Sequence, residues 1–294
     1  MPVLQAFQAI GNREDLSNEV VNITPTEAPF FAACEKKEAS GVFHESQTDT
    51  LDTAATNTQI EGADATFPTL GVTTRVGNYC QIQNKAFWVS DTQEAVSKAG
   101  RDSEYAYQAQ KAMKALARDA EFDLIQNASA SGASATGREL NGMFAAIATN
   151  TSSASPARPL DETLYNDMLQ TIFEAGGNPN VTYLNGWQKR QVSAFTGATG
   201  TSKNIALADK RLINAVDYYE SNFGLQKLVL DRHVPTDRIG LIEQAMMKVA
   251  FLRPTHHKPL PDDGGGPRGK IEHELTLEYW PEAAHGEILN LTTS

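Results

Sequence analysis

The residue types best suited to metal chemistry occur in two short segments near the C-terminus. His256 and His257 are adjacent, so their side chains point in different directions, and no third ligand accompanies them at a helical or turn spacing. A zinc ion needs several ligands arranged around it, so a solvated loop explains these histidines better. The segment Glu272-His273-Glu274 resembles part of the H-E-x-x-H motif without its second histidine. On a strand, the two glutamates share one face and His273 the other, which predicts a solvated sheet edge.

Nucleophilic, phosphate-binding and calcium-binding patterns are incomplete. Asp231-Arg232-His233 offers an acid and a base, but no serine lies in a G-x-S-x-G elbow and neither cysteine has a protease signature. The segment 197–203 resembles a phosphate loop but lacks the G-x-x-x-x-G-K-[ST] spacing. Asp262-Asp263-Gly264 lacks the alternating ligands and closing glutamate of a calcium loop. The sequence therefore predicts no catalytic site, no metal, no cofactor and no enzymatic activity.

Composition narrows the class of protein. The chain has 294 residues, of which 40% are apolar and 21% charged, values typical of a soluble globular protein with one large domain or two modest ones. With 25 basic and 36 acidic residues, the net charge of −11 repels phosphate and argues against a dedicated nucleic-acid binder. A negative wall around packaged DNA is compatible with this charge, because such a wall does not grip the DNA.

Targeting signals and cysteine usage point to a protein that stays where it is made. No apolar run approaches the ~20 residues that span a bilayer. The first 19 residues lack a basic start followed by an apolar core, so we expect no secretory signal and a cytoplasmic protein. Cys34 and Cys80 are too few for a disulfide scaffold and lack the paired spacing of a zinc site, so reduced thiols are expected.

The front of the chain divides into an arm and a polar excursion. Residues 1–39 hold prolines and no periodicity, which indicates an extended arm with one or two short helical turns, for example at 25–27. Residues 42–48 and 72–82 alternate like strands, and residues 50–68 between them form a long loop. A two-stranded excursion with so little apolar surface cannot stabilise itself in water, so another subunit must cover it or it stays flexible.

The strongest helical pattern covers residues 91–127. Ser90 is placed to cap this helix, and Gln93 three residues later completes a capping box. Small or apolar residues follow one face, which predicts an amphipathic helix of about 37 residues and roughly 55 Å, with a weak point at Gly100. Its length is far above the ~11–12 residues of an average helix, so it needs a structural reason.

The second half of the chain alternates between helices and strands. A compact α/β region is expected over residues 155–232. Its elements are a helix at 161–175, a strand at 181–184, a helix at 186–195 and a strand at 225–230. The C-terminal part then turns to β structure. It consists of a strand with a helical alternative at 239–252, an exposed loop rich in Pro, His and Gly at 253–270, an alternating strand at 271–279 and a last strand at 285–291.

The order of these features resembles the Hong Kong 97-type capsid fold of tailed bacteriophages. Short segments along nearly the whole chain also resemble one family of phage major head proteins that shares this fold. These segments are Gly11-Asn12-Arg13-Glu14-Asp15-Leu16, Asn22-Ile23-Thr24-Pro25-Thr26-Glu27-Ala28-Pro29-Phe30, Thr48-Asp49, Glu61-Gly62, Arg75, Asn78, Gln81-Ile82, Ala99-Gly100-Arg101, Arg118-Asp119-Ala120-Glu121, Glu274-Leu275-Thr276-Leu277-Glu278 and Ala284-His285-Gly286. The Pro- and Gly-rich segment 254–267 departs from the family's pattern.

The resemblance implies an α+β fold of the Hong Kong 97 type. Its expected parts are an N-terminal arm (1–41), an E-loop hairpin (42–84), a first P-domain part with the spine helix (85–154), an A-domain (155–235) and a second P-domain part with the exposed loop (236–294). The E-loop would lie over a neighbouring subunit, the arm along the spine helix of an adjacent one, and the A-domains would meet at the centres of hexamers and pentamers.

The resemblance also implies where subunits contact one another and what else they meet. The candidate interface residues are Arg13, Glu14, Glu45, Asp49, Glu61, Arg75 and Arg101. The expected partners are other copies of the chain in an icosahedral shell, a portal, a separate scaffolding protein and a decoration protein. The shell would enclose double-stranded DNA without reading its sequence and without a membrane, after assembly in the bacterial cytoplasm. Two alternatives stay open, an encapsulin-like nanocompartment shell and a cytosolic α/β enzyme.

Overall fold

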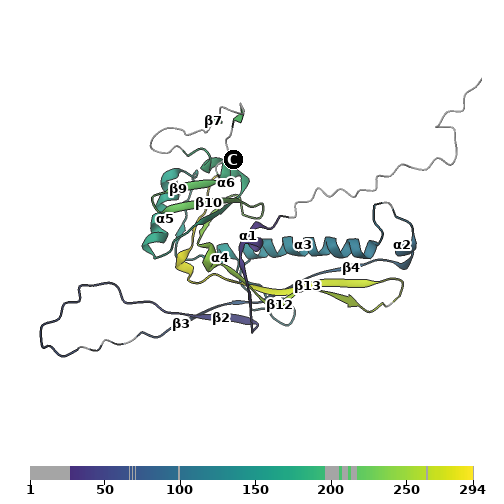
Figure 1. Cartoon of the computed structure of the whole chain (residues 1–294), viewed down its shortest axis with the longest axis horizontal. Coiled ribbons are helices and arrows are strands. Elements are labelled where there is room, and N and C mark those ends of the chain that lie inside the picture. Colours follow the sequence, from purple (N-terminus) through teal and green to yellow (C-terminus); the bar gives the residue numbers. More distant parts are fainter. Residues whose placement is uncertain are drawn as a thin grey trace, which may run out of the picture. The chain divides into compact units, whose positions relative to one another are not determined.

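The computed structural model describes residues 27–65, 67, 69, 71–98, 100–195, 205–206, 211–212, 217–262 and 264–293 (Figure 1). The chain divides into two compact units. Among the described residues, unit 1 contains Asn84–Leu116 and His256–Glu272, and unit 2 contains Ala28–Gln83, Ala117–Thr255 and the chain from His273 onward. The helices are α1 (Pro29–Ala33), α2 (Asp91–Ala95), α3 (Glu104–Gln126), α4 (Met143–Ala146), α5 (Glu162–Glu174) and α6 (Gly186–Val192), with 3-10 turns η2 (Gln244–Met246) and η3 (Glu282–Ala284).

The described strands form four sheets. The four-stranded sheet has the order β1 (Glu35–Glu38), β12 (Lys248–Leu260), β13 (Arg268–Glu278), β4 (Gln81–Trp88). The six-stranded sheet has the order β5 (Thr151–Ser152), β14 (Gly286–Ile288), β11 (Ile239–Ile242), β6 (Val181–Leu184), β10 (Gly224–Leu230), β9 (Tyr218–Ser221). The two remaining sheets are the hairpins β2 (Phe43–Thr48) with β3 (Thr74–Tyr79) and β7 (Ile205–Ala206) with β8 (Arg211–Leu212).

The predicted 37-residue helix is wrong in its length, because the chain breaks it into α2 and α3. Ser90 does cap α2 as predicted, accepting a hydrogen bond from Gln93 N at 3.2 Å. The chain then leaves the helical path and passes through Gly100, whose φ of 78° lies in the left-handed region. Glu94 accepts hydrogen bonds from the backbone N–H groups of Glu104 and Tyr105, at 2.9 and 3.3 Å. The Glu94 carboxylate of α2 thus accepts from the first two N–H groups of α3, which have no partner within that helix. The helical conformation resumes at this point as α3.

The predicted exposed loop at 253–270 is instead a β-hairpin, formed by the ends of β12 and β13. Its residues are mostly exposed, as expected, but the strands reach Leu260 and resume at Arg268. Pro254 and Pro259 obscured this strand, since proline cannot donate to a ladder. Strand β1 pairs with β12 only as far as Phe251, so beyond it β12 is an edge among the described strands, where proline is tolerated.

The prediction of a solvated edge at Glu272-His273-Glu274 is also wrong. All three residues are buried, because β13 lies between β12 and β4. Arg138 and Arg253 hold the Glu274 carboxylate, at 2.8 and 2.9 Å. The ring of His273 contacts Gln83 Oε1 at 2.6 Å, and burial lowers the pKa of His273 to about 4, so this ring is neutral at pH 7. Because the charge of Glu274 is paired and His273 is neutral, the free-energy cost of burying these residues is reduced.

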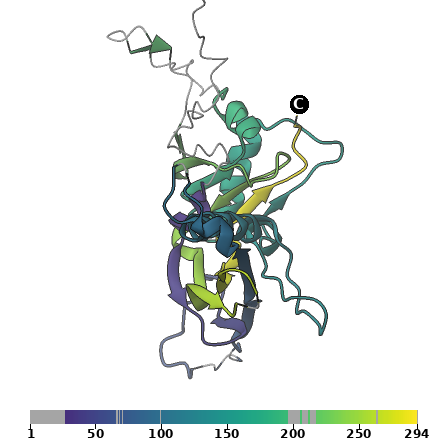
Figure 2. The same cartoon turned by 90° about the vertical axis from the view of Figure 1, so that its right-hand side faces the viewer.

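The predicted α/β alternation is confirmed in unit 2. Asp161 caps α5 by accepting from Leu164 N at 2.7 Å, and β6 and β10 pair in parallel. Helix α5 packs on the six-stranded sheet, and Figure 2 shows this teal helix beside the green strands. The sheet also takes in β5, β11 and β14, which the sequence analysis placed outside residues 155–235. The boundaries of the named capsid parts stay a prediction.

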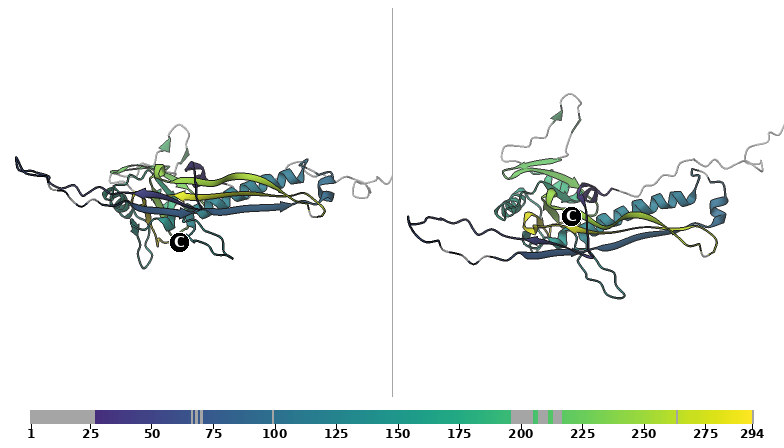
Figure 3. Two further views of the ribbon diagram at one scale, coloured as in Figure 1. Left: turned by 90° about the horizontal axis from the view of Figure 1, so that it is seen from below. Right: turned by 60° about the horizontal axis from the view of Figure 1, so that its bottom comes forward.

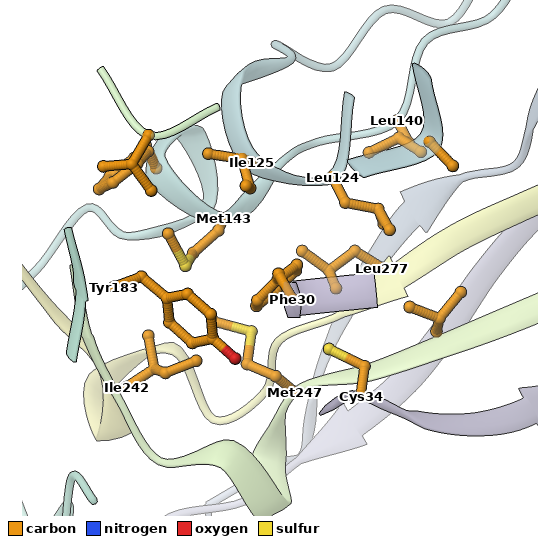
Figure 4. Packing of buried hydrophobic residues seen from close by; sticks show 14 of the residues in the cluster. Phe30, Cys34, Leu124, Ile125, Leu140, Met143, Tyr183, Ile242, Met247 and Leu277 are labelled. Atoms are coloured by element: carbon orange, nitrogen blue, oxygen red, sulfur yellow. The ribbon is translucent and has the colours of Figure 1, made fainter. Parts of the chain in front are cut away.

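The main apolar core of unit 2 gathers segments from distant parts of the sequence. Phe30 from α1 is fully buried, and its ring meets that of Tyr183 edge-on at 5.2 Å. Figure 4 shows Phe30, Tyr183, Met143, Met247 and Leu277 converging in this cluster. Since α1 belongs to the segment predicted as an extended arm, the last part of that segment is a component of the core.

Candidate functional site: the β2–β3 hairpin and its anchor

The β2–β3 hairpin forms a regular antiparallel ladder from Phe43 opposite Tyr79 to Thr48 opposite Thr74. The rings of Phe43 and Tyr79 lie 4.6 Å apart. A side chain at Gly77 would bring its Cβ within 2.8 Å of both His44 O and the Phe43 ring, so only glycine fits this close approach. The two strands Phe43–Thr48 and Thr74–Tyr79, here called the hairpin base, are therefore closely packed despite their polar composition.

Between the strands lies a long excursion, residues 49–73, here called the hairpin tip. Figure 3 shows this dark segment running out from the β2 and β3 ends without a neighbouring element. Every described residue of the tip is exposed. The large apolar side chains among its described residues are Leu51 (99% exposed), Ile60 (83%), Phe67 (92%) and Val72 (88%). The tip also carries four acidic residues and no lysine or arginine. Its apolar groups thus contribute nothing to the core of the described chain.

The hairpin base is fastened to β13 by buried polar contacts. His44 Nε2 of the base lies 2.5 Å from Oε1 of the buried Glu278. Lys37 Nζ of β1 lies 2.9 Å from the same oxygen. Asn78 is buried and donates to Asn141 O at 3.0 Å and to Leu277 O at 2.9 Å. Its Oδ1 accepts from Asn141 N at 2.7 Å. Because each partner would be left unsatisfied without Asn78, this residue fixes the position of β3.

A second polar network continues this anchor into β4. Gln81 Nε2 donates to Asp123 Oδ2 at 2.6 Å, and Gln81 Oε1 accepts from Asn127 Nδ2 at 2.9 Å and Leu140 N at 3.1 Å. Gln83 also donates to Asp123. Burial raises the pKa of Asp123, while these amide donors favour its ionised form. The start of β4 is thereby tied to α3 within unit 2.

The candidate interface residues occupy different environments. Arg13 and Glu14 lie outside the described residues. The structure brings together Glu45 and Arg75, which form an exposed ion pair at 3.1 Å within the hairpin base. Asp49 accepts a hydrogen bond from the following residue's N–H at 2.9 Å at the start of the tip.

The remaining candidates are Glu61 and Arg101. Glu61 is exposed in the tip. Arg101 belongs to unit 1, where it pairs with Glu104 at 2.5 Å and stacks on the Tyr107 ring at 4.8 Å. A role of any of these residues between subunits stays a prediction.

Sequence reasoning missed the residues that anchor the hairpin. Asn78, Gln81 and Glu278 belong to the segments that carry the family resemblance, but a polar residue on an alternating strand gave no reason to expect burial. The segments of resemblance did contain one indication of these roles. A polar residue that belongs to such a segment and has no reactive neighbours is suited to a structural hydrogen-bond network.

The described residues give no indication of a metal site. They contain no group of three or more His, Cys, Asp or Glu side chains that could hold a metal ion. None of the described helices is both long and apolar enough to cross a bilayer. A cavity of about 600 Å³ in unit 1 is lined by Phe87, Trp88, Val89, Ser90, Gln93, Glu104 and Gln108. Its one carboxylate, Glu104, is engaged by Arg101 and by Gln108 Nε2 at 2.7 Å.

Comparison with known proteins identifies the class of this chain. The family model of the SU10 major capsid protein matches residues 3–292. The major capsid protein of Escherichia phage Phieco32 is 23% identical, over 96% of this chain and 95% of that protein.

Solved structures agree in fold at low sequence identity. The capsid of the native GTA particle has a TM-score of 0.73 and 10% identity, covering 98% of both chains. Gordonia phage Cozz gives 0.63 and 11% identity over 97% and 92%. The SrpI encapsulin of Synechococcus elongatus PCC 7942 gives 0.61 and 9% over 97% and 94%. The predicted α+β capsid fold of the Hong Kong 97 type is confirmed. Because the family model spans nearly the whole sequence, the chain belongs to the SU10 major capsid protein family and has a structural role in a phage capsid.

Proposed function

We propose that the chain self-assembles into hexamers and pentamers of an icosahedral head that encloses double-stranded DNA, and that each hairpin tip is ordered by a neighbouring copy. The observation that carries this proposal is the contrast between a firmly anchored hairpin base and a tip in which four large apolar side chains of the described residues are exposed. Burying a Leu, Ile, Phe or Val side chain stabilises by about 1.5–3 kcal/mol, or ~6–12 kcal/mol for four. Part of this gain is lost to the entropy of ordering the tip.

The partner of the tip is another copy of the chain rather than DNA. The acidic tip and the net charge of −11 both repel phosphate. Contacts between identical subunits that are head-to-tail close into rings when the rotation closes, which is the geometry of hexamers and pentamers. The chain is structural and acts through these contacts, a role that family membership favours over the cytosolic α/β enzyme considered at the start.

Further partners follow from the same role. The head would be assembled in the bacterial cytoplasm with a portal and a separate scaffolding protein. The solved phage G structure contains gp27 major capsid proteins with gp26 decoration proteins, and a decoration protein is proposed here by that analogy.

An encapsulin-like compartment is the second candidate, supported by the likeness to the SrpI encapsulin. The two functions differ in their contents. A phage head holds DNA and has a portal at one vertex, whereas an encapsulin holds protein cargo. Electron microscopy and nucleic-acid analysis of native particles separate them.

Replacing apolar side chains of the tip tests the proposed contact. The double variant Leu51→Ser with Phe67→Ser should fold normally, because neither side chain is buried, but should give far fewer shells in expression lysates. The matched control is Thr53→Ser with Thr58→Ser, which changes the same tip and keeps its apolar groups. Equal shell yields from the two variants, measured by sedimentation and negative-stain imaging, would contradict the proposal.

A further inference from the structure

The start of α1 is held by a single buried carboxylate. Glu121 on α3 is fully buried, and its Oε1 and Oε2 accept hydrogen bonds from Phe30 N at 2.7 Å and Phe31 N at 2.6 Å. These N–H groups lie in the first turn of α1 and have no partner within the helix. Glu121 therefore supplies the polar half of the contact that seats α1, while the Phe30 ring supplies the apolar half.

A second buried carboxyl group faces the first. Asp231 follows directly after β10 and is only 2% exposed. Its Oδ1 accepts from His233 N at 2.8 Å, whereas no N–H group of the described residues donates to its buried Oδ2. Hydrogen bonding with Asp231 and the charge of Asp231 both act to raise the pKa of Glu121. Two ionised carboxylates are both acceptors only, so a hydrogen bond between these two groups requires that one of them hold a proton.

The surroundings leave Glu121 as the group in this cluster whose pKa is raised to about 8. Burial and the neighbouring Asp231 raise the pKa of Glu121 to about 8. The other titratable groups that interact with Glu121 are Cys34, Lys36 and Tyr183. Burial raises the pKa of the Cys34 thiol to about 12 and also raises that of the Tyr183 phenol, so both stay neutral. Lys36 is the one cation among them, and its Nζ already donates to Phe31 O.

We propose that the Glu121–Asp231 pair is a proton-dependent latch that fastens α1, and the junction to the residues before it, onto α3. With one proton, the pair carries a single negative charge and satisfies both N–H groups of α1. Without it, two adjacent carboxylates remain in a buried site, and release of α1 lets water reach them. This inference is independent of the proposed hairpin contact.

The direction of the pH effect follows from the raised pKa. The folded pair holds its proton up to about pH 8, whereas a free glutamate releases it near pH 4.5. The folded state therefore binds more protons between these values, and the stabilisation is full below pH 4.5 and lost as the pH rises through 8. The latch therefore weakens steadily between pH 4.5 and pH 8, and this stabilisation is gone in weakly alkaline solution.

Hydrogen exchange of the full-length unassembled chain tests the latch. Amide protection of residues 30–36 is measured at pH 6.5 and pH 9 and corrected for the intrinsic pH dependence of exchange. The wild-type protection should fall at least about tenfold, while the α5 segment 162–174 stays unchanged. Asp231→Asn should keep the protection at both pH values, since its amide can donate to an ionised Glu121. Unchanged wild-type protection, or an equal fall in Asp231→Asn, would overturn the proposal.

A second variant and a spectroscopic measurement cover the case in which Asp231→Asn does not fold. Glu121→Gln replaces one of the two accepting oxygens with an NH2 donor, so one of the two amides of α1 loses its present acceptor, and protection should be low at both pH values. In carbon-13 NMR of the wild type, the carboxyl resonance that disappears in Glu121→Gln should titrate near pH 8. A midpoint below pH 5 for that resonance would overturn the latch on its own.

Discussion

The base and the tip of the β2–β3 hairpin are neighbours in sequence, but the base is fixed by buried contacts and the tip is exposed to solvent. The base is fixed by buried hydrogen bonds from Asn78 and by the contact of His44 with the buried Glu278. The tip has four exposed large apolar side chains and no core of its own among the described residues. Buried polar contacts fix the position of the base, whereas the tip stays uncovered. This arrangement suits a tip that contacts another molecule.

This contrast also explains why both regions look polar in the sequence. In the base, polar side chains point into a network that satisfies them, so they stabilise the folded chain. In the tip, polar and apolar side chains alike face solvent, so they contribute little until a partner arrives. Polar side chains therefore stabilise the fold in the base, whereas in the tip they are exposed and available to a partner.

Removing the Asn78 side chain should have the largest effect on the isolated chain. Asn78→Ala leaves Leu277 O and both backbone groups of Asn141 without their partner in a buried site. We expect a loss of about 3 kcal/mol in the free energy of unfolding, measured by urea denaturation of the unassembled chain. The matched control, Asn57→Ala in the tip, should change stability by less than about 0.5 kcal/mol. Equal effects of the two variants would abolish the distinction between base and tip.

The sheet that holds the base should respond to acid through His273. Burial lowers the pKa of His273 to about 4, below the unfolded value of 6.5. The unfolded chain then takes up a proton first, so the stability present above pH 6.5 is lost as the pH falls through 4. Each pH unit in this window costs roughly 1.4 kcal/mol per group.

A difference measurement isolates this histidine from the other titrating groups. His285 titrates in the same window, and raised carboxyl pKa values act in the opposite direction. The stability of the wild type relative to His273→Gln should therefore be followed from pH 7 to pH 4.5, and it should decline by about 2 kcal/mol. A constant difference would show that His273 is not held neutral.

Reversing the charge of Arg75 should have the smallest effect on the unassembled chain. Its ion pair with Glu45 is exposed, and such pairs are worth about 0–1 kcal/mol. We expect Arg75→Glu to shift the free energy of unfolding by less than about 1 kcal/mol but to reduce shell yield, because Arg75 is one of the charges proposed to pair between subunits. Unchanged shell yield would argue against a role of Arg75 between subunits.

The sequence predicted the elements whose pattern is local. The cap at Ser90, the helix after Asp161 and the strand Val181–Leu184 all follow from spacing and composition, and the structure has them. Family resemblance added the capsid fold. The uncovered tip also followed from composition, since an excursion poor in apolar residues cannot bury itself.

The predictions were wrong where contacts between residues distant in the sequence determine the structure. The restart of α3 depends on Glu94 reaching the backbone of Glu104, which no helical periodicity reveals. Burial of Glu274 depends on two arginines supplied by other segments, Arg138 and Arg253. Polar residues on a strand are predicted to face water unless their partners are known, and those partners lie far away in sequence.

Amide exchange of the hairpin tip, measured in unassembled chains and in assembled shells, tests whether a neighbouring copy orders the tip. We expect the backbone amides of residues 49–73 to exchange at nearly unprotected rates in the unassembled chain and to become strongly protected in shells, while residues 74–79 are protected in both. Strong protection of the tip in the unassembled chain, or its absence in shells, would show that no neighbouring copy orders the tip.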